Sequence, residues 1–438
     1  MNEILIYAHK ETNRVRYVFN LVFDNLLKVK YNITTDLDFF QSADQPKMMY
    51  GVKAHTDDLF FRAHGVLFER GVRNFEFNFS EYGGNPTFFQ VYDTDSVLPF
   101  DIFAAIFYLV TRYEEYLPFV RDKHGRFTAH LSLSKQLNIL EKPIVNIWAL
   151  EIKKIIQKRY PDFAFPEKKF RFLATYDVDS AWGYAQKSLF RIVGGYYLSL
   201  KKLDFKEIVT RTKVLLGRKK DPFDTFDLQL GYQKKYNLRT IYFFLFSRYS
   251  RYDKNLNIYN RKFRRLVKWI ADYATVGLHP SYYSSEQPEL LKSELSSLMD
   301  LLKIDIRHSR QHFLRLMLPD TYQNLIENDL QEDYTMGYAG APGFRAGIAD
   351  TYRFYDLALE VETKLRIHPF AVMDGTLRDY MYLTPDQAIE KIRQLIQEVR
   401  NVKGTFISVW HNDALSEENR WKGWRRVYES LLEMATTE

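Results

Sequence analysis

The residues best suited to chemistry in this sequence are two closely spaced aspartates and three histidines that lie at or just beyond apolar runs. They are Asp177, Asp179, His279, His312 and His411. Two carboxylates held close together repel each other, so one is readily kept as a base while a cation neutralises the other. Together with imidazoles from other strand ends, these carboxylates predict a divalent-metal hydrolase site.

Each of these residues also has an ordinary structural role open to it. Asp177 and Asp179 could cap a helix, His279 could belong to a turn because Pro280 follows it, and His411 could end a strand. The hydrolase site is favoured because all of them fall at strand ends, where the expected fold carries its functional groups.

The second part of the chain alternates apolar strands with amphipathic helices. Strands are expected at 170–176, 240–246, 276–279 and 405–410, and helices at 260–275, 287–303, 322–330 and 385–399. Thr384, Pro385 and Gln387 form a strong helix start signal. Alternation of this kind over about 270 residues predicts an α/β fold with a parallel sheet, closed or nearly closed into a TIM-like barrel.

The first part predicts a smaller α/β or α+β domain. Strands are expected at 4–7 and, from its alternating Phe residues, at 75–79, and a long apolar helix at 100–117. A segment at 159–169 holds two prolines and a cluster of charge. We therefore expect an N-terminal domain over residues 1–165 and a second domain over residues 166–438.

Composition excludes some classes of protein. The 438 residues are 46% hydrophobic and 27% charged, which suits large buried cores and not a disordered chain. There is no cysteine, so disulfides, cysteine-bound zinc and a thiol nucleophile are excluded. The N-terminal residues read as a strand and not as a signal peptide, and no apolar run reaches the ~20 residues of a membrane span. A cytoplasmic protein is the expectation.

The charge is concentrated in one segment. Residues 187–220 carry ten basic and two acidic side chains, a net charge of +8 within a chain of net charge +7. Aromatic and aliphatic residues lie between these charges, a pattern that suits an anionic membrane surface such as the inner membrane face. A pair of solvated helices packed on the domain is the alternative. No nucleic acid is expected as a partner, because no nucleic-acid motif accompanies the patch.

From about residue 170 to the C-terminus, the order of motifs resembles the polysaccharide deacetylase superfamily, also called the NodB-homology or carbohydrate esterase family 4 group. Thr175-Tyr-Asp177-Val-Asp179 is similar to its first motif with one residue inserted between the acids. The resemblance implies a distorted (β/α) barrel in which Asp177 is the catalytic base, Asp179 and His279 bind the metal, Arg310 orients the base and His411 is the general acid.

One position departs from the family pattern. Tyr283 stands where the family has its second metal-binding histidine, and we expect it to contact substrate instead. His312 is the candidate for the missing ligand, with His308 as second choice. Arg345, between Gly343 and Gly347, could reach an acidic or phosphorylated sugar from a tight turn, or could be an ordinary surface arginine.

Several phrases also resemble a narrower group of deacetylase-like proteins, many of them from Bacteroidetes, that carry an extra N-terminal domain. They include Gly277–Tyr282, Arg310–His312, Gly343–Gly347 and Val409–Asn412. The resemblance implies a metal-dependent hydrolase, with zinc as the expected ion, that removes N-acetyl groups from an amino sugar or polysaccharide precursor. The alternative is a catalytically inactive relative that binds glycans or acts as a scaffold in surface-polysaccharide biosynthesis.

Overall fold

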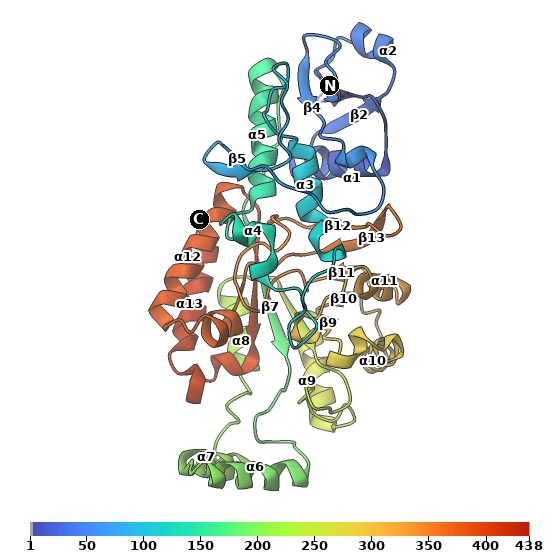
Figure 1. Cartoon of the computed structure of the whole chain (residues 1–438). Helices are drawn as coiled ribbons and strands as arrows, with labels where there is room; N and C mark the ends of the chain where they lie inside the picture. Colours follow the sequence, from blue (N-terminus) through green and yellow to red (C-terminus); the bar gives the residue numbers. More distant parts are fainter. Residues whose placement is uncertain (1–2, 438) are drawn as a thin grey trace.

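The computed structural model describes residues 3–437, and its two larger sheets lie one above the other in Figure 1. The N-terminal sheet has the order β2-β1-β3-β4, and every pair in it is parallel. Its strands are β1 (Glu3–Ala8), β2 (Lys30–Thr34), β3 (Lys47–Gly51) and β4 (Leu59–Arg62). The strand expected at 4–7 is therefore confirmed. Almost all of β1 and β3 is buried, as is usual for the central strands of a parallel sheet.

The N-terminal sheet is accompanied by several helices. They are α1 (Asn13–Phe19), which continues as a π-helical turn at Asn20–Leu26, α2 (Leu37–Ser42), α3 (Ile102–Val110), α4 (Leu133–Gln136) and α5 (Ile144–Arg159). All of α3 is buried. The helix expected at 100–117 is shorter than predicted because Arg112 adopts a left-handed backbone conformation, with φ of 55°, and a 3-10 turn at Tyr113–Tyr116 follows it.

The strand expected at 75–79 was wrong. Within the described residues that segment pairs with no strand, and the nearest ladder is the short hairpin of β5 (Ser80–Tyr82) and β6 (Asn85–Thr87). The alternating phenylalanines instead join an aromatic cluster: Phe75 and Phe77 lie 5.1 and 5.3 Å, between ring centroids, from Phe89. The alternation of Phe with other residues therefore indicated an extended segment with one buried side. Such a segment does not need to pair with another strand.

The C-terminal sheet has nine strands in the order β12-β13-β11-β10-β9-β8-β7-β15-β14. All neighbours are parallel except the β12–β13 hairpin. The strands are β7 (Arg171–Val178), β8 (Thr240–Phe244), β9 (Thr275–Leu278), β10 (His308–Ser309), β11 (Glu332–Asp333), β12 (Tyr352–Asp356), β13 (Val361–Ile367), β14 (Val372–Met373) and β15 (Thr405–His411). The four strands expected in this part are confirmed, and together with β10 they place their carboxyl ends along one edge.

The segment between β13 and β14 has hydrogen-bonded neighbours on both sides. On one side, the backbone N–H groups of His368 and Phe370 donate to the carbonyl oxygens of Asp333 and Met336, at 2.8 and 3.2 Å. On the other side, the N–H of Ala371 donates to the carbonyl oxygen of Ile407 in β15, at 2.9 Å. The segment therefore connects β11 and the residues that follow it to β15.

Helices flank the C-terminal sheet (Figure 1). They are α8 (Phe226–Lys235), α9 (Arg261–Ala271), α10 (Pro288–Leu302), α11 (Asp320–Glu327), α12 (Pro385–Asn401) and α13 (Trp424–Thr436). The start signal at Thr384 is confirmed, because the side chains of Thr384 and Gln387 form a reciprocal capping box. A further pair of helices, α6 (Leu189–Lys201) and α7 (Phe205–Leu215), stands apart from the sheet.

Residues from the first part of the chain contact the C-terminal sheet directly. The buried Arg14 of α1 forms an ion pair with Glu360 in the β12–β13 turn, and the hydroxyl of Tyr17 donates to the carbonyl oxygen of Arg353 at 2.8 Å. The predicted division of the chain near residue 165 falls between α5 and β7 and stays a prediction.

Candidate active site

The register of the C-terminal sheet brings the predicted site residues together. Asp177, near the end of β7, lies opposite His411 at the end of β15. On the other side of the site, Ser309 pairs with Leu278, so the residues that follow β10 lie beside His279, which follows β9. Residues far apart in the sequence therefore meet because neighbouring parallel strands end at the same edge.

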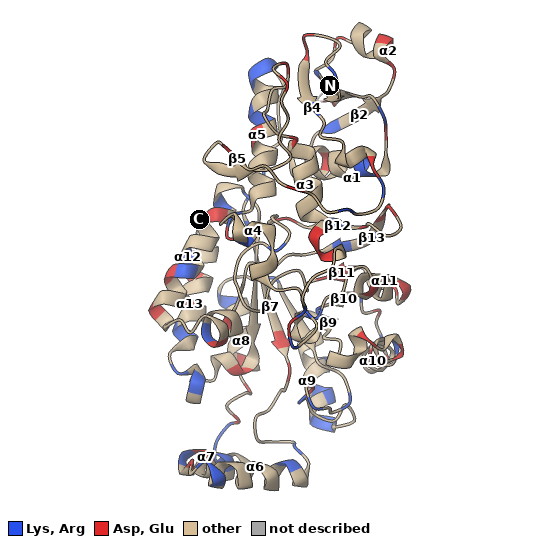
Figure 2. Ribbon diagram, in the orientation of Figure 1, with Lys and Arg blue, Asp and Glu red and all other residues tan. Residues whose placement is uncertain are grey.

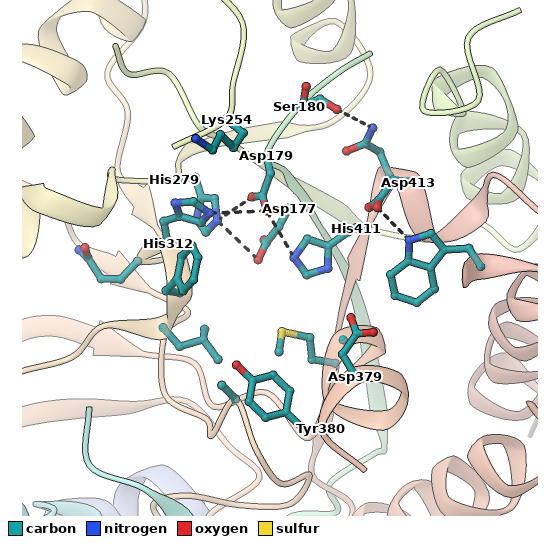
Figure 3. A pocket seen from close by; sticks show the side chains of 18 of the residues that line it. Asp177, Asp179, Ser180, Lys254, His279, His312, Asp379, Tyr380, His411 and Asp413 are labelled. Atoms are coloured by element: carbon teal, nitrogen blue, oxygen red, sulfur yellow. Dashed lines mark hydrogen bonds and ion pairs between the residues drawn. The ribbon is translucent and has the colours of Figure 1, made fainter. Parts of the chain in front are cut away.

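Asp179, His279 and His312 form a cluster with the geometry of a metal site (Figure 3). Their nearest ligand atoms all lie within 4.8 Å of one another. Asp179 Oδ1 is 3.3 Å from His279 Nε2, and Asp179 Oδ2 is 3.5 Å from His312 Nε2. The structure thus places His312 beside the other two residues, and its role as a metal ligand stays a prediction. His308 lies elsewhere, where its Nδ1 is 3.3 Å from the hydroxyl of Tyr334.

The cluster fits a cation better than it fits a closed hydrogen-bond network. Asp179 Oδ1 is a buried atom without a hydrogen-bond partner. The Nδ1 of His279 donates to the carbonyl oxygen of Arg310, and the Nδ1 of His312 is 2.8 Å from Asp253 Oδ1. These contacts leave both Nε2 atoms directed at Asp179. Metal-binding histidines typically have one nitrogen anchored in this way, so two imidazoles and one carboxylate are suited to hold zinc or a similar ion.

Asp177 is held beside the cluster by Arg310. The Nη1 atom of Arg310 is 2.7 Å from Asp177 Oδ1, and both side chains are almost completely buried. The Nε–H of Arg310 donates to the carbonyl oxygen of Tyr334 at 2.9 Å, and its guanidinium carbon lies 4.5 Å from the ring centroid of Phe243. The other carboxylate oxygen of Asp177 is 4.0 Å from His279 Nε2. Asp177 is therefore fixed in place with one oxygen facing the cluster.

His411 lies on the opposite side of the cluster from His312 and is anchored by Asp374. The Nδ1 of His411 is 2.7 Å from Asp374 Oδ1, and the backbone N–H of His411 donates to Asp374 Oδ2 at 2.7 Å. Burial lowers the pKa of His411, but the negative charge of Asp374 and its hydrogen bond outweigh this and raise the pKa well above its usual value. The Nε2 of His411 points into the site, 4.0 Å from Asp179 Oδ2.

The protein's own charges compensate one another in the cluster. Burial raises the pKa of Asp179, but the charge of His312 and the nearby Nε2 groups of His279 and His312 bring it well below its usual value. Burial lowers the pKa of His312, whereas Asp179 and Asp253 raise it, to about 9 in total. A proton on His312 and a cation beside it therefore compete for the same carboxylate.

A cavity of about 380 Å³ is lined by Asp177, Asp179, His279, His312 and His411. Aromatic and apolar side chains complete the wall, among them Phe313, Met373, Tyr380 and Trp421. A second cavity, of about 400 Å³, adjoins it and has several wall residues in common with it. These common residues are Arg126, Leu314, Ala339 and Tyr380. The wall of the second cavity also includes residues 127–130 of the N-terminal part, so the two halves of the chain form one groove between them.

Two residues predicted to bind substrate lie outside the cavity that holds Asp177 and His411. Arg345 is buried, and its guanidinium Nε is 2.9 Å from Glu115 Oε1 while its Nη1 donates to the carbonyl oxygen of Gly337 at 3.0 Å. Tyr283 lies in a 3-10 turn beside Tyr252, with ring centroids 6.1 Å apart. Arg345 therefore links the two parts of the chain through its contact with Glu115. Its loop is flanked by glycines, as the sequence shows, but it is buried and not on the surface.

Sequence reasoning missed Asp253 and Asp374, the residues that anchor His312 and His411. Asp253 lies in the loop after β8, a polar stretch without a motif, and Asp374 follows the short strand β14 in a Gly-containing turn. The position of Asp374 after an apolar run was the one available signal. Nothing in the sequence around Asp253 indicated its role.

Comparisons with known proteins match the N-terminal part to one family and find solved structures of low sequence identity. Residues 4–161 match a family of unknown function (DUF7033). No curated protein matches the sequence. Among solved structures, the chain is similar to a protein from Mycobacterium smegmatis described as a polysaccharide deacetylase, with 15% identity and a TM-score of 0.40 over 62% of this chain and 87% of that one.

Two further solved structures are similar to this chain at comparable levels. One is BA3943, a CE4 family pseudoenzyme from Bacillus anthracis, with 12% identity and a TM-score of 0.30 over 61% of each chain. The other is a 4-alpha-glucanotransferase from Thermococcus litoralis, with 11% identity and a TM-score of 0.36 over 62% of this chain and 37% of that one. Proteins with three different descriptions are thus similar to it.

Proposed function

We propose that this protein is a metal-dependent hydrolase that removes N-acetyl groups from an amino sugar or a polysaccharide precursor. The observation that carries the proposal is the convergence of three anchored groups on one cavity. These groups are the cluster of Asp179, His279 and His312, the Asp177–Arg310 pair and the His411–Asp374 pair. Such a site has a cation-binding group, a base and an acid within reach of one substrate atom. The order of the motifs supports a NodB-type barrel as its scaffold.

The division of roles follows from the contacts. Asp179, His279 and His312 would hold the divalent ion, for which zinc is the best candidate because two imidazoles and one carboxylate leave a position open. When bound, this ion polarises the amide carbonyl and the attacking water. Asp177, held in place by Arg310, accepts the proton of that water.

The leaving group needs a proton as well. His411 carries one, because Asp374 raises its pKa, and its Nε2 faces the cavity. It donates this proton to the amine nitrogen as the carbon–nitrogen bond breaks, so that acetate and a free amine leave. Asp374 acts as a positioning residue, since it fixes which nitrogen of His411 faces the substrate.

The shape of the site favours an extended substrate over a single sugar. The cavity of the proposed reaction continues into a second one past Arg126 and Tyr380, and together they offer room for more than one sugar ring. The exposed ring of Tyr380, which lines both cavities, suits the apolar face of a sugar ring. We therefore expect oligosaccharides to react faster than the corresponding monosaccharide.

Metal content and acetate release together test this function. Purified protein is analysed for bound metals and then incubated with N-acetylated amino-sugar oligomers while acetate is measured. We expect about one zinc-type ion per chain, loss of that ion in His279→Ala with His312→Ala, and loss of acetate release but not of metal in Asp177→Asn and His411→Ala. A matched control is His55→Ala, since that exposed histidine lines neither cavity.

Other outcomes have distinct meanings. Metal binding without acetate release, combined with binding of the oligomers, would favour the inactive, glycan-binding alternative. Absence of any divalent ion from the wild-type protein after reconstitution would overturn the proposal.

A further inference from the structure

The helices α6 and α7 form a hairpin that stands away from the rest of the molecule (Figure 1). Two extended connections, on either side of residues 189–215, link it to the end of β7 and to α8. The Asp221 carboxylate joins these connections, because it accepts hydrogen bonds from the backbone N–H groups of Gly183, Tyr184 and Ala185 at 2.8–2.9 Å. The hairpin is therefore held at a defined place.

The outer surface of this hairpin is apolar to a degree unusual for a solvated helix pair. Phe190 is 91% exposed and Leu203 is 72% exposed. The other large exposed apolar side chains of the hairpin and its turns are Leu189, Val193, Tyr197, Leu198, Leu200, Phe205, Val209, Leu215 and Leu216. Exposed apolar patches of this kind mark surfaces that contact another body.

The space between the two helices is occupied by polar groups. Arg211 is buried in the hairpin, where it forms an ion pair with Glu207 at 2.6 Å. It packs so closely on Gly195 that a Cβ there would lie 2.5 Å from its guanidinium carbon. The hydroxyls of Tyr196 and Thr212 are 2.8 Å apart. The two helices contact each other through these polar groups. The exposed apolar residues therefore do not belong to a hydrophobic core between the helices.

Positive charge surrounds the apolar surface. Both acidic residues of the segment are already engaged, Glu207 by Arg211 and Asp204 as the N-cap of α7. Four exposed lysines of this segment form no ion pair within residues 3–437: Lys201, Lys202, Lys206 and Lys213. Figure 2 shows basic residues at both ends of the hairpin, with uncharged residues between them. This combination of exposed apolar side chains and lysines suits a lipid surface that has negatively charged headgroups and an apolar layer beneath them.

The hairpin is connected to the candidate active site. The guanidinium of Arg191 in α6 donates to the carbonyl oxygens of Asn255 and Lys254, at 2.7 and 2.8 Å. Lys254 lines the cavity, and the preceding residue, Asp253, anchors His312. A surface that binds the hairpin would therefore lie at a fixed position relative to the cavity.

We propose that the α6–α7 hairpin docks the protein on an anionic lipid bilayer. The apolar side chains enter the boundary between headgroups and acyl chains, and the four lysines lie against lipid phosphates. None of the described helices is long and apolar enough to cross a membrane. The basic segment predicts the inner membrane face as the place of docking.

Vesicle co-sedimentation of the full chain tests this proposal. We expect the protein to sediment with phosphatidylglycerol-containing vesicles and to stay in solution with phosphatidylcholine vesicles, and its binding to fall as salt rises. The Lys201→Glu, Lys202→Glu, Lys206→Glu variant should bind about hundredfold more weakly, at about fivefold per lysine. The matched control, Lys10→Glu, Lys28→Glu, Lys53→Glu, changes the net charge equally at exposed sites elsewhere and should bind as the wild type does.

Insertion is tested separately from charge. Phe190→Trp should show a blue-shifted tryptophan emission on addition of anionic vesicles, whereas Tyr92→Trp, at a site 88% exposed in the N-terminal part, should not. Equal sedimentation of the two triple variants, or an unchanged emission in Phe190→Trp, would overturn the proposal. Vesicle-independent self-association that Phe190→Ser abolishes would also overturn it, in favour of a second copy as the partner.

Discussion

Asp253 Oδ1 lies 2.8 Å from His312 Nδ1, on the opposite side of the imidazole from Asp179. The same carboxylate oxygen accepts a hydrogen bond from the backbone N–H of Tyr282 at 2.9 Å, and Ser250 donates to the other oxygen. Asp253 is thus fixed from three sides, and it fixes His312 in turn. This relationship supplies the ring orientation that a metal ligand needs.

Replacement of Asp253 by Asn should weaken metal binding. We expect a loss of about 10–100-fold in zinc affinity, because His312 loses the charge that orients its ring and raises its basicity. Competition with a zinc-binding dye measures this affinity. Asp227→Asn is the matched control, since that side chain is 70% exposed and contacts only Lys220. Equal affinities in the two variants would contradict the role given to Asp253.

The Asp177–Arg310 pair should contribute to both stability and activity. Arg310→Met leaves the carboxylate of Asp177 buried without its partner, so we expect the free energy of unfolding to fall by about 3–5 kcal/mol and acetate release to be lost. The double variant with Asp177→Asn should regain much of the stability and none of the activity. Urea unfolding and acetate assays on the three proteins separate these effects. A double variant as unstable as Arg310→Met would show that the pair does not act as a unit.

The Arg345–Glu115 pair should act on stability alone. Arg345→Met leaves the buried Glu115 with Arg112 alone, which Glu114 shares, and we expect a loss of up to about 3–5 kcal/mol that Glu115→Gln partly restores. Metal content and the KM for the N-acetylated monosaccharide should stay as in the wild type, because Arg345 lines the second cavity and not that of the metal cluster. A raised KM at unchanged stability would instead support the prediction that Arg345 binds substrate.

The buried carboxyl group of Asp101 should make the free energy of unfolding depend on pH. Burial raises its pKa to about 6, although it accepts hydrogen bonds from Tyr50, His64 and Ala104. Between the unfolded value of about 3.9 and this folded value, the folded state binds more protons, so the contribution of Asp101 to stability falls as pH rises from about 4 to 6. The stability difference between wild type and Asp101→Asn should shrink by about 1–3 kcal/mol over that interval. Urea unfolding at several pH values measures it, and a constant or widening difference would contradict the expectation.

The strands and the main site residues were predictable because each carries a strong local signal. Apolar runs ending in polar residues identified β7, β9 and β15, and parallel strands necessarily bring such ends together. His312 was named as a metal ligand from the resemblance to the deacetylase superfamily, and the short strand β10 that precedes it was not predicted. The function itself stays a proposal.

The remaining features depended on tertiary contacts that have no local signal. Arg112 ends α3 in a left-handed conformation and pairs with Glu114 and Glu115, which no helical periodicity foretells. The phenylalanines at 75–79 alternate because one side of an extended segment meets an aromatic cluster. Arg345 has the sequence surroundings of an exposed loop, and only the fold reveals that Glu115 lies beside it.

The buried Glu115 pairs with Arg112 from its own part of the chain and with Arg345 from the second part. Glu114 shares Arg112, so the first half produced alone would hold two carboxylates against one arginine, and the second half would expose Arg345 without its partner. Exchanging one half between relatives should therefore succeed only when the matching charge travels with it.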